Sequence, residues 1–304
     1  MKDTINYNYN LDAQNIIEQN GKYYFNINNK EYFFVFFNRN IEELNDIVKI
    51  IDYMKSTGIT HNNIIINKHN SYLTKVGEYN YILIESINSL EEYDIFNIID
   101  FQKKLLLNHN NTKIYRNNWE KLWSEKIDYI EYQINELGIN KEIILQSINY
   151  FIGLAENAIS YVNIAKSYYN NKGRVVLSHR RIFYPNYRLN FLNPISFIFD
   201  LEVRDIAEYI KSMFYYDKEE AFLELETYLK VKPLDIYEYH MLYARLLYPS
   251  NYFDIYEQVM NNNESEDKLM NIINKANDYE LFLKKVYLEI SKYTYLTKID
   301  WLIN

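Results

Sequence analysis

Several kinds of residue and segment are scarce in this sequence, and each shortage excludes a class of protein. It contains no cysteine, so it can form neither a disulfide framework nor a thiolate metal site. Only 4 prolines and 6 glycines interrupt it, which favours long helices over a turn-rich β-sandwich. No apolar run is long enough to span a bilayer, and no basic-then-apolar leader segment is visible. We therefore expect a protein without a membrane span that is made in the cytoplasm.

The charge and the apolar content narrow the choice further. The formal net charge is −8, and lysines and arginines never cluster beyond adjacent pairs, which argues against nucleic acid as a partner. Hydrophobic residues make up 48% of the chain, enough for a sizeable core. The 33 tyrosines are more simply explained by codon bias than by a functional cluster, although exposed tyrosines also suit assembly surfaces.

The first ninety residues are rich in predicted strands. Asn28–Lys30 separates the first two strands as a hairpin turn. Apolar spacing predicts an amphipathic helix over Ile41–Lys55, capped by Asn40 and ended by Gly58. The β-branched and aromatic runs lie at Tyr23–Ile27, Tyr32–Phe37, Ile64–Ile66, Tyr72–Val76 and Tyr81–Ile84.

From residue 91 onward the apolar residues follow a helical period, broken by short strands at Val175–Leu177 and Ser196–Phe199. The sequence therefore predicts an α+β protein of two lobes, with a strand-rich lobe at residues 1–90 and a helical lobe at residues 91–304. The expected helices include Ile95–Leu107, one starting near Trp119, Ile143–Ala165, Ile206–Phe214, Glu219–Leu229, Tyr237–Leu247 and Glu266–Tyr293.

The segment Ser178–Asn186 resembles the catalytic loop of kinases of the aminoglycoside phosphotransferase type. In those kinases a strand leads into His-x-Asp, an Asn follows, and a second strand delivers a metal-binding Asp. By this resemblance His179 fills the first position, while Asn186 and Asp200 fill the magnesium positions. Arg181 occupies the position of the catalytic Asp, and a guanidinium cannot act as a general base. Alternatively, His179 is a hydrogen-bonded core histidine, because a His and an Asn at this spacing also occur by chance.

Four longer blocks of the sequence stand out: Trp119–Trp123, Gly153–Ile159, Arg204–Ile210 and Leu242–Pro249. Together they resemble one family, the YutH-type spore coat proteins, which are similar to the CotS group and share its phosphotransferase-like fold. The resemblance covers residues 119–253, whereas the lobe before it matches only in the order of its elements. It implies a two-lobed, protein kinase-like fold.

The parts of a kinase that bind the nucleotide also lack a clear counterpart in this sequence. A kinase covers the phosphates with a glycine-rich hairpin and clamps them with a strand lysine, but here only Gly21 precedes the first hairpin and Tyr32–Phe37 has no lysine. Arg39, with Glu42 or Glu43, is either a remnant of the lysine–glutamate pair or a solvated surface pair. We favour the surface pair.

Two further expectations concern the helical lobe. Glu156 lies in an apolar helix, so we expect it to be a buried acid paired with Arg204 or Arg245. Tyr215 and Tyr216 end a helix, and we expect both to be exposed and available as interface anchors.

These observations favour a non-catalytic, pseudokinase-type spore coat protein that acts as a structural or scaffolding component in sporulation. We then expect no catalytic residue in the degenerate loop of His179, Arg181 and Asn186. We expect no cofactor, and other coat or mother-cell proteins as partners, with self-association possible. The protein would be made in the mother-cell cytoplasm and assembled onto the spore coat. The alternative is an atypical phosphotransferase or a nucleotide-binding sensor that uses ATP and magnesium, with Asn186 and Asp200 as vestigial metal ligands.

Overall fold

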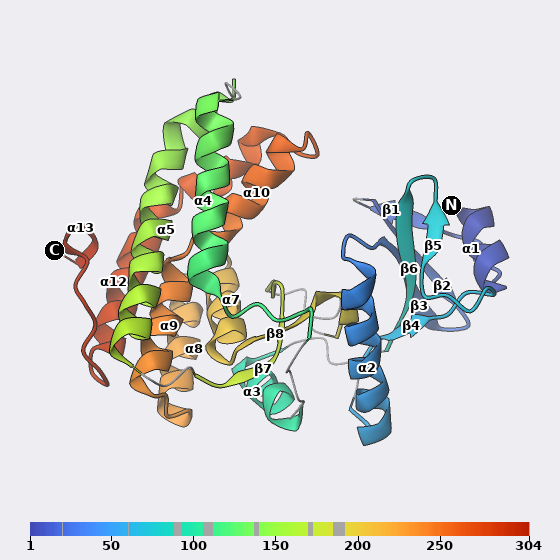
Figure 1. The fold of residues 1–304 in the computed structure, drawn as a ribbon, viewed down its shortest axis with the longest axis horizontal. Helices are drawn as coiled ribbons and strands as arrows, with labels where there is room; N and C mark the ends of the chain where they lie inside the picture. The colour runs from blue at the N-terminus through green and yellow to red at the C-terminus, as the bar shows by residue number, and fades with distance from the viewer. Residues whose placement is uncertain are drawn as a thin grey trace. The chain divides into compact units, whose positions relative to one another are not determined.

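The computed structural model describes the chain except for residues 20, 60, 88–92, 106–111, 137–139, 170–172, 185–191 and 304. The described chain forms two compact units (Figure 1). Unit 1 comprises Met1–Tyr115 and Val176–Phe199, and unit 2 comprises Arg116–Val175 and Asp200–Asn304. The predicted lobe boundary at residue 90 falls on residues that the structure does not describe, so it stays a prediction.

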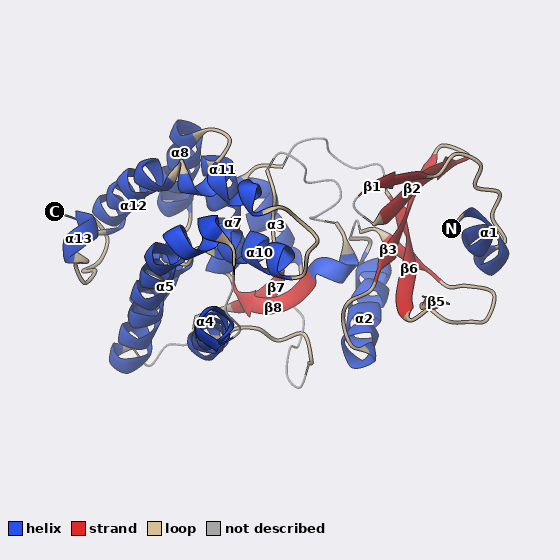
Figure 2. Ribbon diagram, turned by 90° about the horizontal axis from the view of Figure 1, so that it is seen from above, coloured by secondary structure: helices blue, strands red, loops and turns tan. Residues whose placement is uncertain are grey.

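Unit 1 is built around an antiparallel sheet in the order β1-β2-β3-β6-β4, and β5 pairs with β6 outside this path. Figure 2 shows the helices α1 and α2 on opposite sides of this sheet. All five predicted strands are present, whereas α1 and β1 were not predicted. The elements are α1 (Lys2–Tyr9), β1 (Ile17–Gln19), β2 (Lys22–Ile27), β3 (Lys30–Phe36), α2 (Ile41–Thr57), β4 (Asn63–Ile65), β5 (Thr74–Val76) and β6 (Tyr79–Ser86).

The hairpin between β2 and β3 sets the register of the sheet. Asn28 and Asn29 turn the chain with φ values of 50° and 63°, the left-handed conformation that two-residue hairpin turns require and that Asn tolerates. Phe25 then lies opposite Tyr32, and Tyr24 lies opposite Phe33. Successive strand residues point to opposite faces, so each aromatic pair belongs to one face of the sheet. The Phe25–Tyr32 pair joins the core beneath α1.

Helix α2 begins at the predicted residue, Ile41, and ends at Thr57, two residues beyond the predicted Lys55. The Asn40 side chain accepts a hydrogen bond from the Glu43 backbone N–H at 2.8 Å, which satisfies one of the open donors of the first turn. Gly58 follows the last turn with φ of 70°, a conformation that costs glycine little.

The later part of unit 1 contains α3 (Ile95–Lys104) and most of a small two-stranded sheet of β7 (Val175–His179) and β8 (Phe197–Leu201). Val175 at the start of β7 and Asp200 and Leu201 at the end of β8 belong to unit 2. A 3₁₀ turn at Pro194–Ser196 leads directly into β8. Both predicted strands are present, and each extends two residues beyond its predicted end. The two strands deliver His179 and Asp200.

Unit 2 is helical. Helix α9 is buried from Tyr239 to its end at Leu247 and packs against α5 and α7. The predicted helices are present, with one correction: the expected single helix Glu266–Tyr293 is divided into η2, α11 and α12. A turn at Asn274 and Lys275 separates α11 from α12, and asparagine is a weak helix former. The helices are α4 (Trp119–Glu136), α5 (Glu142–Tyr168), α7 (Val203–Phe214), α8 (Lys218–Val231), α9 (Ile236–Leu247), α10 (Ser250–Met260), η2 (Glu266–Leu269), α11 (Met270–Ile273), α12 (Ala276–Ile290) and α13 (Asp300–Ile303).

Candidate functional site: the degenerate kinase motif

His179 is the last residue of β7 and is completely buried. Its ring packs beside those of Phe101 on α3 and Phe197 on β8, with ring centroids 5.3 Å and 5.5 Å away. Packing against these two phenyl rings contributes to the position of the buried imidazole. This geometry agrees with the interpretation of His179 as a core histidine.

Arg181, in the position of the catalytic Asp, lies just after β7 and is partly exposed. Its Nη1 donates a hydrogen bond to the carbonyl oxygen of the neighbouring Arg180 at 2.8 Å. Asn186 lies outside the described residues. The predicted role of Asn186 and Asp200 as a magnesium pair therefore stays a prediction.

Asp200 on β8 is the carboxylate in the predicted metal position, and its side chain is fully buried. Its Oδ1 accepts hydrogen bonds from the Trp119 indole N–H at 2.9 Å and from the Leu201 backbone N–H at 2.7 Å. Its Oδ2 accepts one from Arg204 Nη1 at 2.6 Å and lies 3.1 Å from the same indole nitrogen. Both carboxylate oxygens are thus engaged by donors from the protein itself.

The electrostatics of Asp200 follow from this enclosure. Burial raises the pKa of the Asp200 carboxyl, because a charged group loses its hydration there. The guanidinium groups of Arg204 and Arg245 and the indole N–H of Trp119 oppose that rise. Magnesium needs a nearly ideal octahedron of oxygens and gives up water reluctantly. To bind it, Asp200 would have to release a donor that stabilises a buried charge.

Two acidic residues that follow Asp200 also form ion pairs. Glu202 is buried and lies 2.9 Å from Lys232 Nζ and 3.6 Å from Arg174 Nη1. Glu208 on α7 pairs with Arg245 Nε of α9 at 2.8 Å. Buried acids of this kind need a nearby cation, and these pairs tie α7 to its neighbours.

Lys211 on α7 completes this buried charge network. It is only 2% exposed, and its Nζ lies 3.9 Å from Glu208 Oε1. It donates to the carbonyl oxygens of Arg245 at 2.8 Å and Tyr248 at 2.7 Å, and to Ser250 Oγ at 3.1 Å. The first two carbonyls belong to the end of α9, where no further helical turn can satisfy them. Lys211 therefore acts as a side-chain cap for that helix.

Trp119 and Trp123 are buried, as predicted, and stack with ring centroids 5.3 Å apart. Tyr248 continues the stack, 4.2 Å from Trp123. The Arg245 guanidinium carbon lies 5.3 Å and 5.6 Å from the two indole rings, within reach of a cation–π interaction. Two of the sequence blocks typical of the coat family, Trp119–Trp123 and Leu242–Pro249, therefore meet in the core of unit 2 beside Asp200.

The pair formed by Arg39 and Glu43 corrects a prediction. We expected a solvated surface pair, but the side chains are only 1% and 9% exposed, with Nε and Oε2 2.6 Å apart. Arg39 Nη1 also donates to the carbonyl oxygens of Ile195 and Phe197, both at 2.8 Å. The prediction was wrong because it depended only on the position of Arg39 after a strand. That position says nothing about the carbonyl groups of Ile195 and Phe197, which lie far away in the sequence. Arg39 fastens the start of α2 to the chain that enters β8.

Two expectations in unit 2 were also wrong. Glu156 is exposed, and Arg204 and Arg245, its expected partners, pair with Asp200 and Glu208. We also expected Tyr215 to be exposed. It is instead largely packed, and its ring stacks on that of Tyr279 with the ring centroids 6.1 Å apart.

Tyr216 is 69% exposed, in agreement with its predicted exposure. The Leu242–Pro249 block is internal, as expected.

The hairpin side of the motif shows no phosphate clamp among the described residues. Gly21 forms the turn between β1 and β2 with φ of 69°, which a side chain would strain. Strand β3 starts two residues earlier than predicted and so includes Lys30. That lysine is exposed and pairs with Glu85 at 3.1 Å, on the same face as Tyr32.

The described part of the chain holds no group of three or more His, Cys, Asp or Glu side chains arranged for a metal ion. None of its described helices is long and apolar enough to cross a membrane.

Comparison with known proteins identifies the family of this chain. A family model described as "spore coat putative kinase YutH" matches residues 2–286. The chain belongs to this family. A curated relative, the endospore coat-associated protein YutH of Bacillus subtilis, is 30% identical over 186 residues, which is 54% of each protein. The chain thus spans about half the length of the curated relative that it matches.

Solved structures confirm the fold. An aminoglycoside phosphotransferase from Alicyclobacillus acidocaldarius superposes with a TM-score of 0.63 at 11% identity, covering 94% of this chain and 95% of that one. A spectinomycin phosphotransferase bound to AMP gives 0.56 at 12% identity, covering 97% and 98%. The choline kinase of Streptococcus pneumoniae gives 0.52 at 14%, covering 96% and 98%. The predicted α+β, kinase-like fold is confirmed. At such identities the likeness concerns the fold alone.

Proposed function

We propose that this protein is a non-catalytic, pseudokinase-type component of the spore coat. The observation that supports this best is the state of Asp200. In a working phosphotransferase of this fold, the carboxylate at this position must present oxygen to magnesium. Here the carboxylate is fully buried, and both oxygens accept hydrogen bonds from Trp119, Leu201 and Arg204. Its charge is used to hold unit 2 together.

Arg181 and Arg39 support the same proposal from two other positions. Arg181 supplies a fixed positive charge where a proton acceptor would be needed. Arg39 follows β3 and pairs with the helix glutamate Glu43, as a phosphate-binding lysine would, but its guanidinium is buried and donates to two backbone carbonyls. A cation held in this way is poorly placed to clamp a nucleotide.

The coat role is proposed from the family and from the relative. The relative's name describes association with the endospore coat, and we extend that association to this chain, with assembly from the mother-cell cytoplasm onto the coat. Partners would be other coat or mother-cell proteins, with self-association possible. Tyr216 is an exposed aromatic in unit 2 and a suitable anchor for such a contact.

One observation favours a second candidate, an atypical phosphotransferase or nucleotide sensor. Asp200 keeps the acidic side chain at the end of β8 on a fold that matches kinases over nearly its whole length. Phosphoryl transfer depends mainly on positioning and charge, so a missing base does not by itself abolish it. If ATP and magnesium bind, Asn186 and Asp200 would be the metal ligands.

Nucleotide titration separates the two candidates. We expect neither a shift in melting temperature nor heat of binding when ATP and magnesium are added to the full chain, and no phosphate transfer to small alcohols or aminoglycosides. Arg181→Asp should not restore activity, because it returns only one carboxylate. Saturable ATP binding or turnover that Asp200→Asn abolishes in a folded variant would overturn the proposal in favour of the second candidate.

The coat role is tested in sporulating cells. A fluorescent fusion should reach the surface of the forespore, and pull-downs should recover coat proteins. Tyr216→Ser should reduce that recovery. Tyr7→Ser, which alters an equally exposed tyrosine in unit 1 (66% against 69%), is the matched control. A fusion that stays diffuse would count against the coat role, and equal recovery by both variants would remove Tyr216 from the contact.

A further inference from the structure

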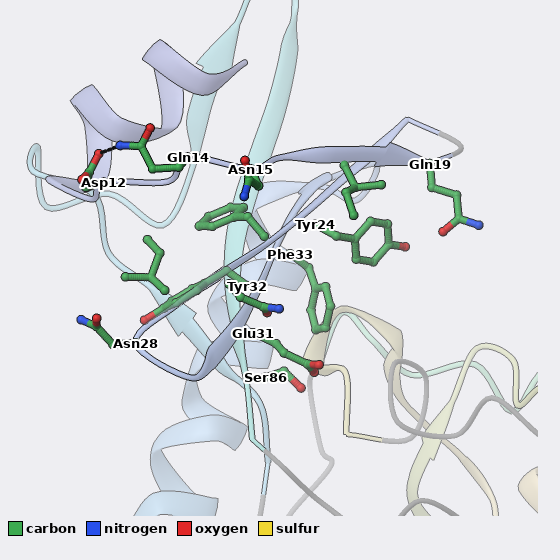
Figure 3. Close-up of a pocket in the computed structure, with 14 residues that line it drawn as sticks. Asp12, Gln14, Asn15, Gln19, Tyr24, Asn28, Glu31, Tyr32, Phe33 and Ser86 are labelled. Carbon is green, nitrogen blue, oxygen red and sulfur yellow. Dashed lines mark hydrogen bonds between the residues drawn. The ribbon is translucent and has the colours of Figure 1, made fainter.

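The outer edge of strand β2 is open beyond Tyr24. Strand β1 pairs with β2 only as far as Tyr24, which lies opposite Ile17. The chain before Ile17 leaves the sheet, so no described strand pairs with residues 25–27 on this side. A pocket of about 920 Å³ occupies the place where β1 would otherwise continue, and Asn15 and Asn26 both line it (Figure 3).

The register of the hairpin determines which backbone groups face this pocket. In a hairpin with a two-residue turn, the residues that flank the turn, here Ile27 and Lys30, exchange both backbone hydrogen bonds. The direction of these groups alternates along a strand, so the N–H and C=O of Asn26 point away from β3 and toward the open edge. Within the described chain, no backbone hydrogen bond reaches these two groups. Asn26 therefore offers a donor and an acceptor side by side, as an unpaired strand edge does.

The pocket follows the edge of the sheet, because its lining comes from both faces. Tyr24 and Phe33 form an edge-to-face pair on one face, with ring centroids 5.4 Å apart, and Phe25 and Tyr32 stack at 5.3 Å on the other. All four rings line the pocket, and Figure 3 shows Tyr32 on one side of the hairpin and Phe33 on the other. A ligand that contacts both faces must lie along the edge between them, as an added strand does.

The side chains along the edge indicate the chemistry of such a ligand. Residues 25–27 carry neither the charges nor the prolines that normally protect an open edge. Asp12 lies on the face of Phe25, because its neighbour Ala13 belongs to the same core cluster as that ring. The Asp12 carboxylate accepts a hydrogen bond from Gln14 Nε2 and forms no ion pair with a described residue. A basic side chain on this face can place its apolar stem against the rings and its charge beside Asp12.

We propose that this edge binds an extended segment of a partner protein, which adds to β2 as a further strand through the backbone of Asn26 and places a basic side chain beside Asp12. The segment residue opposite Asn26 then lies on the face of Tyr24 and packs an apolar side chain there, whereas its two neighbours lie on the face of Asp12. The segment therefore alternates basic and apolar residues. The inference goes beyond the proposed function and does not depend on it.

A second copy of this chain does not suit the same edge. If its β2 were added antiparallel at Asn26, the turn that follows that strand would meet the place opposite Tyr24, where Ile17 already lies. A separate segment can enter from the hairpin end and stop beside Ile17.

Calorimetric titration of the full chain with a capped synthetic peptide of alternating lysine and valine residues tests this proposal. We expect saturable binding of one peptide per chain that weakens as salt increases, because the attraction to Asp12 is partly screened. The same peptide with N-methylated valines lacks the strand donors and should bind at least about tenfold more weakly. A peptide with glutamate in place of lysine should also bind at least about tenfold more weakly, because its charge opposes that of Asp12.

Variants locate the binding at the edge. Proline is tolerated on an edge strand where the N–H faces solvent, so Asn26→Pro removes the outward donor and should lower the affinity at least about tenfold. Asn26→Thr keeps that N–H and is the matched control, with an affinity close to that of the wild type. Asp12→Asn should lower the affinity roughly five- to tenfold, whereas Glu78→Gln, which removes an exposed acid from the β5–β6 turn of the same unit, should not.

Melting curves check that each variant is folded, and the N-methylated peptide decides the question if Asn26→Pro is not. Absence of saturable binding, equal binding of the N-methylated peptide, or an equal loss in Asn26→Thr would overturn the proposal. So would a dimer of the chain alone that Asn26→Pro dissociates in sedimentation, because the edge would then belong to a second copy. The coat role is tested separately in cells, so failure of the peptide to bind leaves it unaffected.

Discussion

Replacing Arg204 with Met separates a structural role of Asp200 from a metal-binding role. The substitution removes the guanidinium that lies 2.6 Å from Asp200 Oδ2, while the Met side chain keeps much of the apolar stem of the arginine in place. Asp200 would then be a fully buried carboxylate without its ion-pair partner. Breaking a buried pair in this way typically costs about 3–5 kcal/mol.

The remaining contacts place the expected loss at the lower end of that range. Trp119 and Leu201 still donate to the carboxylate, and each hydrogen bond to a charged group contributes roughly 1.5–3 kcal/mol. We therefore expect Arg204→Met to lower the free energy of unfolding by about 3 kcal/mol, measured by urea denaturation. Lys166→Met removes a cation 2.9 Å from Glu120, but that pair is 37% and 42% exposed. This control should cost less than about 1 kcal/mol.

The same variant predicts a pH dependence. Without Arg204, burial raises the folded-state pKa of Asp200 with less opposition, whereas in the unfolded chain the group keeps its ordinary value near 3.8. A carboxyl with a raised folded-state pKa makes its full contribution to stability below the unfolded value and loses it as the pH rises through the folded value. The deficit of Arg204→Met should therefore shrink as the pH falls toward 4. The additional change Asp200→Asn should restore stability at neutral pH, because position 200 then carries no buried charge that lacks its ion-pair partner.

Two results would refute this reasoning. One is a loss smaller than about 1 kcal/mol for Arg204→Met, which would mean that water reaches Asp200. The other is a double variant no more stable than the single one. If Asp200 instead served mainly as a metal ligand, Asp200→Asn alone would abolish magnesium binding and leave the denaturation curve without metal almost unchanged.

Three further predictions concern other buried polar contacts. Lys211→Met should lower the free energy of unfolding by about 3 kcal/mol, because it removes a buried cation from beside Glu208 and the side-chain donor from the carbonyls at the end of α9; the exposed Lys230→Met is its control in the same urea assay. Arg39→Met should speed amide hydrogen exchange around Ile195–Phe197, which it anchors, and unchanged exchange would contradict that role. Tyr32→Phe should cost about 1 kcal/mol by removing the hydrogen bond to Glu85. Because the pKa of Tyr32 rises from 10.0 to about 12 on folding, the wild type should lose this contribution between those pH values, and the variant should show a smaller loss.

Much of the fold could be predicted because its signals are local. The alternating aromatic residues of β2 and β3, the Asn turn between them, and the capped apolar stripe of α2 each specify their own element. Helix α1 could not be predicted in this way. Its eight residues are mostly polar, and only Ile5 and Tyr9 are buried, so it is stabilised mainly by packing on the sheet.

Helix α10 was missed for a different reason. Its buried residues Tyr252, Phe253, Tyr256 and Val259 follow a helical period. The signal was therefore present, but the segment is short and immediately follows a proline, which also suits a loop.

The candidate site shows the same difference. Features that depend on nearby residues could be predicted from the sequence, whereas contacts with distant residues could not. The apolar run before Asp200 predicted a short buried strand that ends at this residue. Its pairing with Arg204 is an i,i+4 contact whose spacing the sequence contains, but the apolar helix around Glu156 favoured Glu156 as the partner of that arginine. Trp119 donates from 81 positions earlier in the chain, and no pattern near Asp200 points to that indole.

The two arginine–carboxylate pairs of the degenerate motif show why spacing alone cannot distinguish a remnant site from a structural one. Arg39–Glu43 and Asp200–Arg204 are both four residues apart, and an exposed pair at this spacing contributes only a few tenths of a kcal/mol. In each case remote groups create the burial: the carbonyls of Ile195 and Phe197 enclose the first pair, and the indole of Trp119 covers the second. Burial greatly raises the cost of losing one partner. A buried pair is therefore hard to substitute for structural reasons alone, so the presence of an acid at the kinase position does not by itself indicate phosphoryl transfer.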